Sequence, residues 1–202
     1  MTQEELNKMV DLHEAWFESN EQGKRLELRG VDLRGLNLSR RILHDCLLED
    51  VDLTDADLSG AGIYRADIQN VTFVNANLNR AELNDSDIKN ADFTGANMEE
   101  AEMMGFVNAV NLNFYKARMN KVSFVKSTLT NSIFDNAFLN EADFKRCHID
   151  DSSFENADLH GADFTYALLI RCNGAGANIE GASFSGAKEM PAEWKSKIEI
   201  AV

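Results

Sequence analysis

Apolar side chains recur at every fifth position along most of the chain. In residues 51–70, VDLTDADLSGAGIYRADIQN, the apolar positions are Leu53, Leu58, Ile63 and Ile68, and a small residue stands two places before each. A period of five fits neither an α-helix, with about 3.6 residues per turn, nor a β-strand, with about two. The pattern therefore predicts an architecture assembled from short repeats.

The repeat continues through nearly the whole sequence. It begins at Leu28, shifts by one residue near residues 104–106, and resumes from Ala109 to Phe184. There are 16 repeats before the insertion and 16 after it, and only Ala109 and Gly174 lack a substantial apolar side chain at the centre. Such regular internal spacing indicates a solenoid, in which each repeat packs on its neighbours.

Phenylalanine adds a second period, four times longer than the first. The central phenylalanines fall in two sets, 20 residues apart or 21 across the insertion: Phe73, Phe93, Phe114, Phe134 and Phe154, and Phe124, Phe144, Phe164 and Phe184. Because the sets alternate within groups of four repeats, four repeats should make one turn with phenylalanine on two opposite sides. We expect a square coil whose central residues point inward and whose backbones pair as parallel strands.

The repeats also resemble a known family. ADLSG at 56–60, ANLNR at 76–80, ADFTG at 91–95 and ADFTY at 162–166 are similar to the repeats of pentapeptide-repeat proteins, and the resemblance covers residues 26–186. It implies an all-β solenoid, a right-handed quadrilateral parallel β-helix of about eight coils. It further implies a role, because some members of this family resemble a DNA segment and bind type II topoisomerases, protecting gyrase from quinolones or inhibiting it.

Both ends of the repeat array carry signals for caps. Residues 1–24 are expected to form an N-terminal capping helix, since TQEE after the first residue has the form of a capping box and apolar residues follow at helical spacing, with Gly23 as the stop. The β-helix itself is expected over residues 25–188. Residues 189–202 are expected either to cap the last coil or to join two chains into a homodimer, as in topoisomerase-binding members of the family, through Met190, Trp194, Ile198, Ile200 and Val202.

Composition narrows the classes of function. The 202 residues include 34 acids and 20 bases, a formal net charge of −14, which argues against direct nucleic-acid binding. There is no apolar run long enough to span a membrane and no signal peptide at the acidic N-terminus. Three cysteines without paired spacing suit a reducing compartment. We therefore expect a cytoplasmic protein that does not bind membranes.

Residues able to carry chemistry do not form a catalytic or metal-binding pattern. Cys46, Cys147 and Cys172 fall at the small inward position of their repeats and should belong to the core. The sequence after Asp55 begins like a calcium loop, but Ala66 stands where a bidentate glutamate is needed. The sequence predicts no enzyme activity, no metal and no cofactor.

Charge is distributed unevenly along the predicted rod. Residues 45–103 carry 14 acids and three bases, whereas residues 104–134 carry four bases and no acid. With about 4.8 Å per coil, the first block has one net charge per roughly 1.3 Å, against one per about 1.7 Å in duplex DNA. The candidate partner-binding residues in this block are Asp52, Asp55, Asp57, Asp67, Asp85, Asp87, Asp92, Glu99, Glu100 and Glu102.

Two functions remain open at this stage, and both involve a protein partner. The first is a DNA mimic that binds DNA gyrase or topoisomerase IV through the acidic block, although the Lys and Arg belt interrupts the negative surface that a continuous imitation of DNA requires. The second is a protein-interaction scaffold that uses an outward apolar patch formed by Val110, Tyr115, Val125, Ile133 and Phe138.

Overall fold

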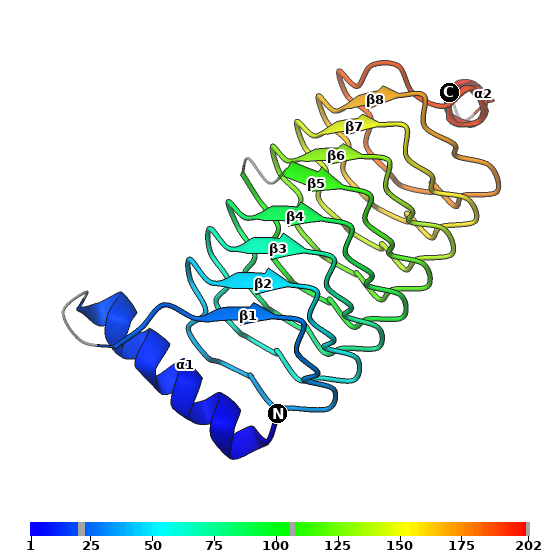
Figure 1. The fold of residues 1–202 in the computed structure, drawn as a ribbon. Helices are drawn as coiled ribbons and strands as arrows, with labels where there is room; N and C mark the ends of the chain where they lie inside the picture. The colour runs from blue at the N-terminus through cyan, green and yellow to red at the C-terminus, as the bar shows by residue number, and fades with distance from the viewer. Residues whose placement is uncertain (20–22, 106–107, 201–202) are drawn as a thin grey trace.

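The chain folds into a rod of stacked coils (Figure 1). The computed structural model describes residues 1–19, 23–105 and 108–200. Helix α1 (Gln3–Glu18) lies at the first coil and helix α2 (Ala192–Ile200) at the last. Between them, the described residues form eight parallel strands in chain order: β1 (Glu27–Arg29), β2 (Leu47–Glu49), β3 (Asp67–Gln69), β4 (Asp87–Lys89), β5 (Asn108–Val110), β6 (Thr128–Thr130), β7 (His148–Asp150) and β8 (Leu168–Ile170).

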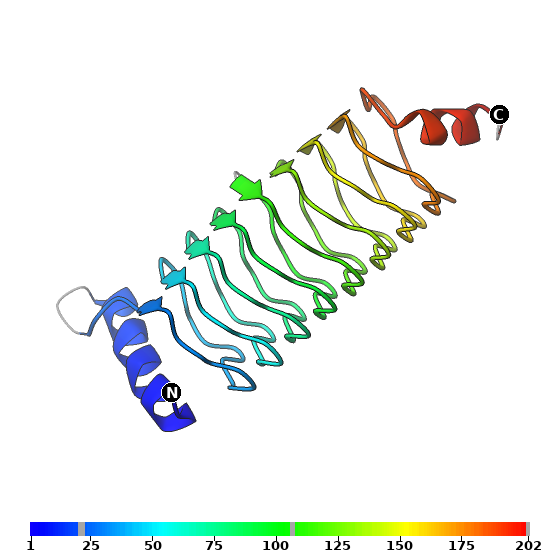
Figure 2. The ribbon, with the colours of Figure 1, turned by 45° about the vertical axis from the view of Figure 1, so that its right-hand side comes forward.

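Each turn of the rod has four sides. All strands lie on one side, called side 1, and Figure 2 shows them stacked along the length of the rod. Rows of isolated parallel bridges mark the other sides in chain order: the row from Asp32 to Asn173 is side 2, the row from Asn37 to Asn178 is side 3, and the row from Ile42 to Ser183 is side 4. The predicted parallel β-helix with four repeats per turn is confirmed.

The pairing register gives the length of each turn. Leu28 pairs with Leu48, which is 20 residues later, whereas Ile88 pairs with Ala109 because one extra residue lies between Glu102 and β5. Seven turns separate β1 from β8, and the bridge from Leu168 to Lys188 closes one more. Residues 106 and 107, next to the inserted residue, lie outside the described part of the chain.

Turn chemistry explains why the sequence bends every five residues. The last residue of nearly every repeat has a positive φ, such as 64° at Gly60 and 55° at Asn70. Glycine, asparagine and aspartate adopt this left-handed conformation more readily than other residues. The polar residue before the centre also stabilises the turn: Asp52 Oδ1 accepts a 2.9 Å hydrogen bond from the N–H of Thr54. The Ala-Asp/Asn-Leu pattern therefore encodes both the inward face and the corner.

Phenylalanine rings form two continuous stacks in the core. Phe73 and Phe93 lie with their ring centroids 4.7 Å apart and their planes 1° apart, and the stack continues to Phe154 on side 2. The second stack runs from Phe124 on side 4. The two meet edge to face, as between Phe124 and Phe134 at 6.0 Å and 89°. Phenylalanine thus occupies two opposite sides, as predicted.

Helix α1 covers the open core of the first coil. Thr2 and Glu5 form the predicted capping box, and the buried face consists of Leu6, Val10 and His13. Arg41, at an inward corner of the first turn, binds Glu14 of this helix at 2.8 Å, which offsets the cost of partly burying its charge. The expected stop at Gly23 is wrong, because the helix ends at Glu18 and Gly23 (φ 94°) packs in the following loop against the carbonyl of Leu12.

Helix α2 closes the other end of the core through Trp194. The indole is fully buried, with its centroid 5.5 Å from the Phe184 ring, so this residue caps its own coil and is not available to a second chain. Met190 and Ile198 are half-buried against the core. Ile200 lies in α2, and Val202 lies outside the described residues. None of the described helices is both long and apolar enough to cross a membrane.

Candidate protein-binding surface

The candidate acidic residues are spread over all four sides of the rod. Side 1 carries Asp67 and Asp87, and side 2 with its corner carries Asp52, Asp55 and Asp92. Side 3 with its corner carries Asp57, Glu99 and Glu100, and side 4 with its corner carries Asp85 and Glu102. The acids therefore surround the coils of residues 45–103 and do not form one acidic face.

Ion pairs divide these ten acids into two groups. Four have a cationic partner: Asp52 with Arg34 (3.6 Å), Asp87 with Lys89 (3.0 Å), Glu99 with Arg118 (2.9 Å) and Glu100 with Arg80 (2.7 Å). The hydrogen bond from Arg80 lowers the pKa of Glu100. Within the described part of the chain, the other six have no ion pair: Asp55, Asp57, Asp67, Asp85, Asp92 and Glu102. Among the described residues of these coils, Asp50 and Glu82 also have no ion pair, and together with these six they supply the uncompensated negative charge.

Three of the acids also hold the backbone in its turns. Asp52, Asp57 and Asp92 each accept a hydrogen bond from the N–H two residues ahead, at 2.9, 3.0 and 3.0 Å. An asparagine side chain has the same acceptor oxygen, so replacement by asparagine removes the charge and keeps the turn. Charge and fold can therefore be separated experimentally at these positions.

The basic belt in the middle of the chain forms a ring around the rod. Lys116, Lys121 and Lys126 occupy three successive corners of one turn, with φ values of 57°, 60° and 62°. Arg118, on side 3 of the same turn, pairs with Glu99 of the coil before. The five-residue spacing of the three lysines was the sequence signal for this ring. The ring separates the acidic coils of residues 45–103 from the later acidic segment.

A row of amides occupies the corner after side 1, and sequence reasoning missed it. Each side chain donates to the one in the coil before, from Asn131 through Asn111, Asn90 and Asn70 to Asp50, with donor–acceptor distances of 2.6–2.9 Å. Asparagine recurring at the turn spacing, with one step of 21, was the available signal. Because asparagine carries no charge, this corner is a neutral stripe from Asn70 to Asn131, and it ends at the Asp50 carboxylate.

The prediction that five outward residues form one apolar patch is wrong. The period of five carries successive outward positions to successive sides, so Val110 lies on side 1 and Val125 on side 4, both half-buried. Tyr115 and Ile133 lie on side 2 and Phe138 on side 3, with exposed fractions of 37%, 43% and 49%. These three flank the corner at Lys116, whose Nζ lies 5.0 Å from the centroid of the Tyr115 ring.

Comparison with known proteins decides the family. The profile described as "Pentapeptide repeats (8 copies)" matches residues 27–62, 63–100 and 152–188, and "Pentapeptide repeats (9 copies)" matches residues 124–168. The chain belongs to the pentapeptide-repeat family. No curated protein matches its sequence.

Two solved structures are among the proteins to which the chain is similar. HetL from the cyanobacterium Nostoc sp. strain PCC 7120, described as involved in heterocyst differentiation regulation, has a TM-score of 0.61 at 20% identity, over 81% of this chain and 86% of HetL. QnrB1, described as a plasmid-mediated fluoroquinolone resistance protein, has a TM-score of 0.44 at 16% identity, over 87% of this chain and 98% of QnrB1. The match to HetL supports the solenoid fold, and none of these matches indicates a catalytic family.

The thiols of this pentapeptide-repeat chain lie in structural positions. Burial raises the pKa of Cys46 and of Cys147 to about 12 and that of Cys172 to about 11, so these side chains remain protonated thiols near neutral pH. Among the described residues, no group of three His, Cys, Asp or Glu side chains is arranged to hold a metal ion. The surface features that remain for function are the acidic coils, the lysine ring and the exposed apolar side chains.

Proposed function

We propose that the chain is a non-enzymatic protein-binding rod whose first acidic coils imitate DNA. The observation that carries this proposal is the arrangement of uncompensated acids around every side of the coils of residues 45–103. Duplex DNA presents negative charge all around its axis, so a basic DNA-binding groove meets that charge whichever way the duplex is rotated. A protein that imitates DNA needs acids on every side in the same way. The acidic coils supply such charge at a linear density close to that of DNA, about one per 1.7 Å.

The partner class that fits best is a type II topoisomerase, DNA gyrase or topoisomerase IV. Such an enzyme binds duplex DNA through a basic surface, and binding of topoisomerases is what the family resemblance implies for some members. At about 4.8 Å per coil, residues 45–103 provide about 14 Å of acidic rod before the lysine ring. The contact should therefore be short and should end at Lys116, Lys121 and Lys126.

The test compares two matched variants in a gyrase supercoiling assay, with and without a quinolone. One variant carries Asp52→Asn, Asp57→Asn and Asp92→Asn in the acidic coils. The control carries Asp143→Asn, Asp158→Asn and Asp163→Asn beyond the ring, where the same turn hydrogen bonds occur, at 3.0, 3.4 and 2.9 Å. Both lose the same charge and keep the turn acceptors.

DNA imitation predicts that the first variant loses its effect on gyrase, that the control keeps it, and that binding by the unmodified chain weakens steeply with salt. Equal loss in both variants, with circular dichroism unchanged, would show that only net charge matters and would reject the assignment of residues 45–103.

A second candidate function is an interaction scaffold, favoured by the exposed side chains of Tyr115, Ile133 and Phe138. Phe138 lines a hollow together with Lys116 and Asn136, and Tyr115 and Ile133 lie on the adjoining side 2. A partner that binds there should be lost on replacing the three by serine and should be retained by the acidic-coil variant. Affinity capture from a bacterial lysate with both variants, scored for gyrase and topoisomerase IV first, separates the two functions.

We also propose that the chain forms a homodimer through its C-terminal segment. The support is a hollow beside α2, lined in part by Ile179, Ala182 and Ile198 at the last coil. Because Trp194 is used internally, the contact would rely on these smaller apolar surfaces and would extend the rod end to end.

A further inference from the structure

At the first coil, helix α1 supplies hydrogen-bond partners to the backbone on some sides of the rod and not on others. In an interior coil, the backbone of each side bonds to the coil before it, and the first coil has no such neighbour. Side chains of α1 take that role at three points: Gln3 Oε1 accepts from Asn37 N–H (2.7 Å), Glu14 Oε1 from Ile42 N–H (3.0 Å) and His13 Nδ1 from Leu26 N–H (3.0 Å). Sides 3 and 4 and the start of side 1 are therefore completed by the helix.

Strand β1 on side 1 keeps an open edge. In β2, Leu47 N–H donates to Leu26 O at 3.0 Å, and Glu49 O accepts from Gly30 N–H at 2.9 Å. The equivalent residues of β1 are Glu27 and Arg29, and within the described part of the chain their backbone groups have no partner on this edge. Unpaired strand edges form hydrogen bonds with extended segments of other chains.

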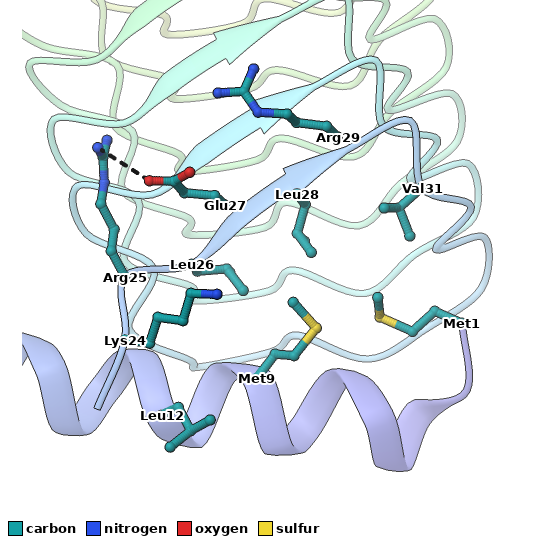
Figure 3. Close-up of a pocket in the computed structure, with 10 residues that line it drawn as sticks. All are labelled: Met1, Met9, Leu12, Lys24, Arg25, Leu26, Glu27, Leu28, Arg29 and Val31. Atoms are coloured by element: carbon teal, nitrogen blue, oxygen red, sulfur yellow. Dashed lines mark ion pairs between the residues drawn. The ribbon is translucent and has the colours of Figure 1, made fainter. Parts of the chain in front are cut away.

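A largely apolar groove runs along this open edge, between β1 and α1 (Figure 3). Its volume is about 530 Å³, and its apolar walls come from Met1, Met9, Leu12, Leu28 and Val31. Leu12 on the helix side of the groove is 51% exposed. A side chain of an added strand that points toward the core would enter this groove.

The charge around the groove is opposite to that of the rest of the protein. Lys24, Arg25 and Arg29 line it together with one acid, Glu27. Arg29 forms an ion pair with Glu49, so Lys24 and Arg25 against Glu27 leave a small positive excess, whereas the whole chain has a formal net charge of −14. Arg25 Nη1 lies 4.0 Å from Glu27 Oε1, and the Lys24 side chain extends over the groove in Figure 3. A segment that carries carboxylates would therefore be favoured here over a basic one.

We propose that the open edge of β1 binds an extended acidic segment of a partner polypeptide as an added strand. Its alternate apolar side chains enter the groove, its backbone pairs with Glu27 and Arg29, and its carboxylates face Lys24 and Arg25. A second copy of the rod fits poorly as the occupant, because its opposite end is closed by α2 and Trp194 and because its own β1 edge would bring the like charges of Lys24 and Arg25 together. This site is separate from the acidic coils and selects a partner of opposite charge.

The probe is a fluorescent, acetylated peptide of about eight residues, the length of a long strand, in which valine and glutamate alternate. Two control peptides carry lysine in place of glutamate, or methyl groups on alternate backbone nitrogens that remove the ladder donors. Binding to the intact chain is followed by fluorescence anisotropy, and amide hydrogen exchange locates the contact.

We expect the valine–glutamate peptide to bind about tenfold or more tightly than either control and to slow exchange of the Glu27 and Arg29 amides. Leu12→Glu should weaken it about tenfold by placing a carboxylate on the groove wall, while Tyr166→Glu, at a side chain 62% exposed on a distant coil, should leave it unchanged.

Three results would overturn the proposal: equal binding of the methylated peptide, exchange protection confined to the lysine ring, or protection of the Glu27 and Arg29 amides in a peptide-free dimer. Protection of these amides in a peptide-free dimer would show that a second copy of the chain occupies the edge of β1.

Discussion

Trp194 occupies the place in the core that Gly174 leaves empty. Gly174 is the central residue of its repeat and follows Phe154 by one turn on side 2, where a large side chain is otherwise the rule. A Cβ atom at Gly174 would overlap Nε1 of the indole, and that Nε1–H donates to the Gly174 carbonyl at 3.0 Å. The break in the repeat pattern is thus the docking point of α2.

The first prediction concerns this pair of residues. Trp194→Ala should lower the free energy of unfolding by about 3–5 kcal/mol, because it opens a cavity at the end of both phenylalanine stacks. Gly174→Leu should also destabilise the intact chain, since the new side chain displaces the indole. In the Trp194→Ala background, however, Gly174→Leu should cost little or should stabilise, because leucine then fills the cavity. Urea melts of the two single variants and the double variant measure this coupling, and additive effects would show that the two sites are independent.

The second prediction separates inward from outward positions at adjacent residues. Phe144 is fully buried and stacks on Phe124 and Phe164 at 5.2 and 4.8 Å, so Phe144→Ala should cost about 3–5 kcal/mol. Asp143 faces outward and pairs with Lys145 at 3.0 Å. Asp143→Asn keeps the turn acceptor and should stay within about 0.5 kcal/mol. Chemical denaturation of both variants decides this, and similar losses of stability would contradict the inward–outward assignment.

The third prediction is a loss of stability at mildly acidic pH through His13. Burial between α1 and the first coil lowers the pKa of His13 from its ordinary value of 6.5, and its Nε2 has no hydrogen-bond partner within the described residues. The folded chain therefore holds His13 neutral while the unfolded chain binds a proton, so stability is fully present above about pH 6.5 and falls as the pH is lowered below it. The His44 backbone and the charges of Glu14 and Asp45 oppose this shift in pKa, whereas the charge of the His44 side chain reinforces it.

The matched variant for this effect is His13→Asn. The asparagine carbonyl can accept the hydrogen bond of Leu26 and does not titrate in this range, so the pH dependence between about pH 7 and pH 5 should become smaller. His44, whose pKa burial also lowers, should account for part of the slope that remains. Thermal melts across this range measure the difference, and an unchanged slope would show that His13 does not control it.

The fourth prediction concerns the proposed homodimer. Ile198→Asp places a charge on the hollow beside the last coil while leaving Trp194 in place. The intact chain should have the mass of a dimer by light scattering, and this variant should have that of a monomer, because a buried unpaired carboxylate opposes association. A monomeric intact chain would leave α2 as a cap only.

The core of this fold could be predicted because its repeat couples turn chemistry to burial. Each inward residue, such as Leu53 or Phe93, recurs with a polar turn residue at fixed spacing, so one period specifies both the corner and the core. The alternation of phenylalanine sets then gave the number of sides. The end of α1 at Glu18 was missed because docking onto the first coil, a tertiary contact, determines the path of the following loop.

The candidate surface was less predictable than the core. Outward positions such as Val110 and Tyr115 are close in sequence but lie on different sides, so an apolar patch cannot be read from neighbouring repeats alone. Ion pairing is equally hidden, because Glu99 meets Arg118 only through the stacking of adjacent coils. The open edge of β1 could not be predicted for a related reason. It depends on which backbone groups of the first coil receive a hydrogen-bond partner from α1.

Imitation of DNA is tested most directly by competition between this protein and duplex DNA for a type II topoisomerase. A fluorescent duplex bound to gyrase would be titrated with the intact chain at two salt concentrations, about 0.05 and 0.3 M, between which electrostatic screening changes strongly. If the acidic coils imitate DNA, the intact chain should displace the duplex, and displacement should weaken at the higher salt concentration. Asp52→Asn, Asp57→Asn and Asp92→Asn together should prevent displacement. A duplex that stays bound at micromolar excess of the intact chain at both salt concentrations would contradict the DNA-mimic function.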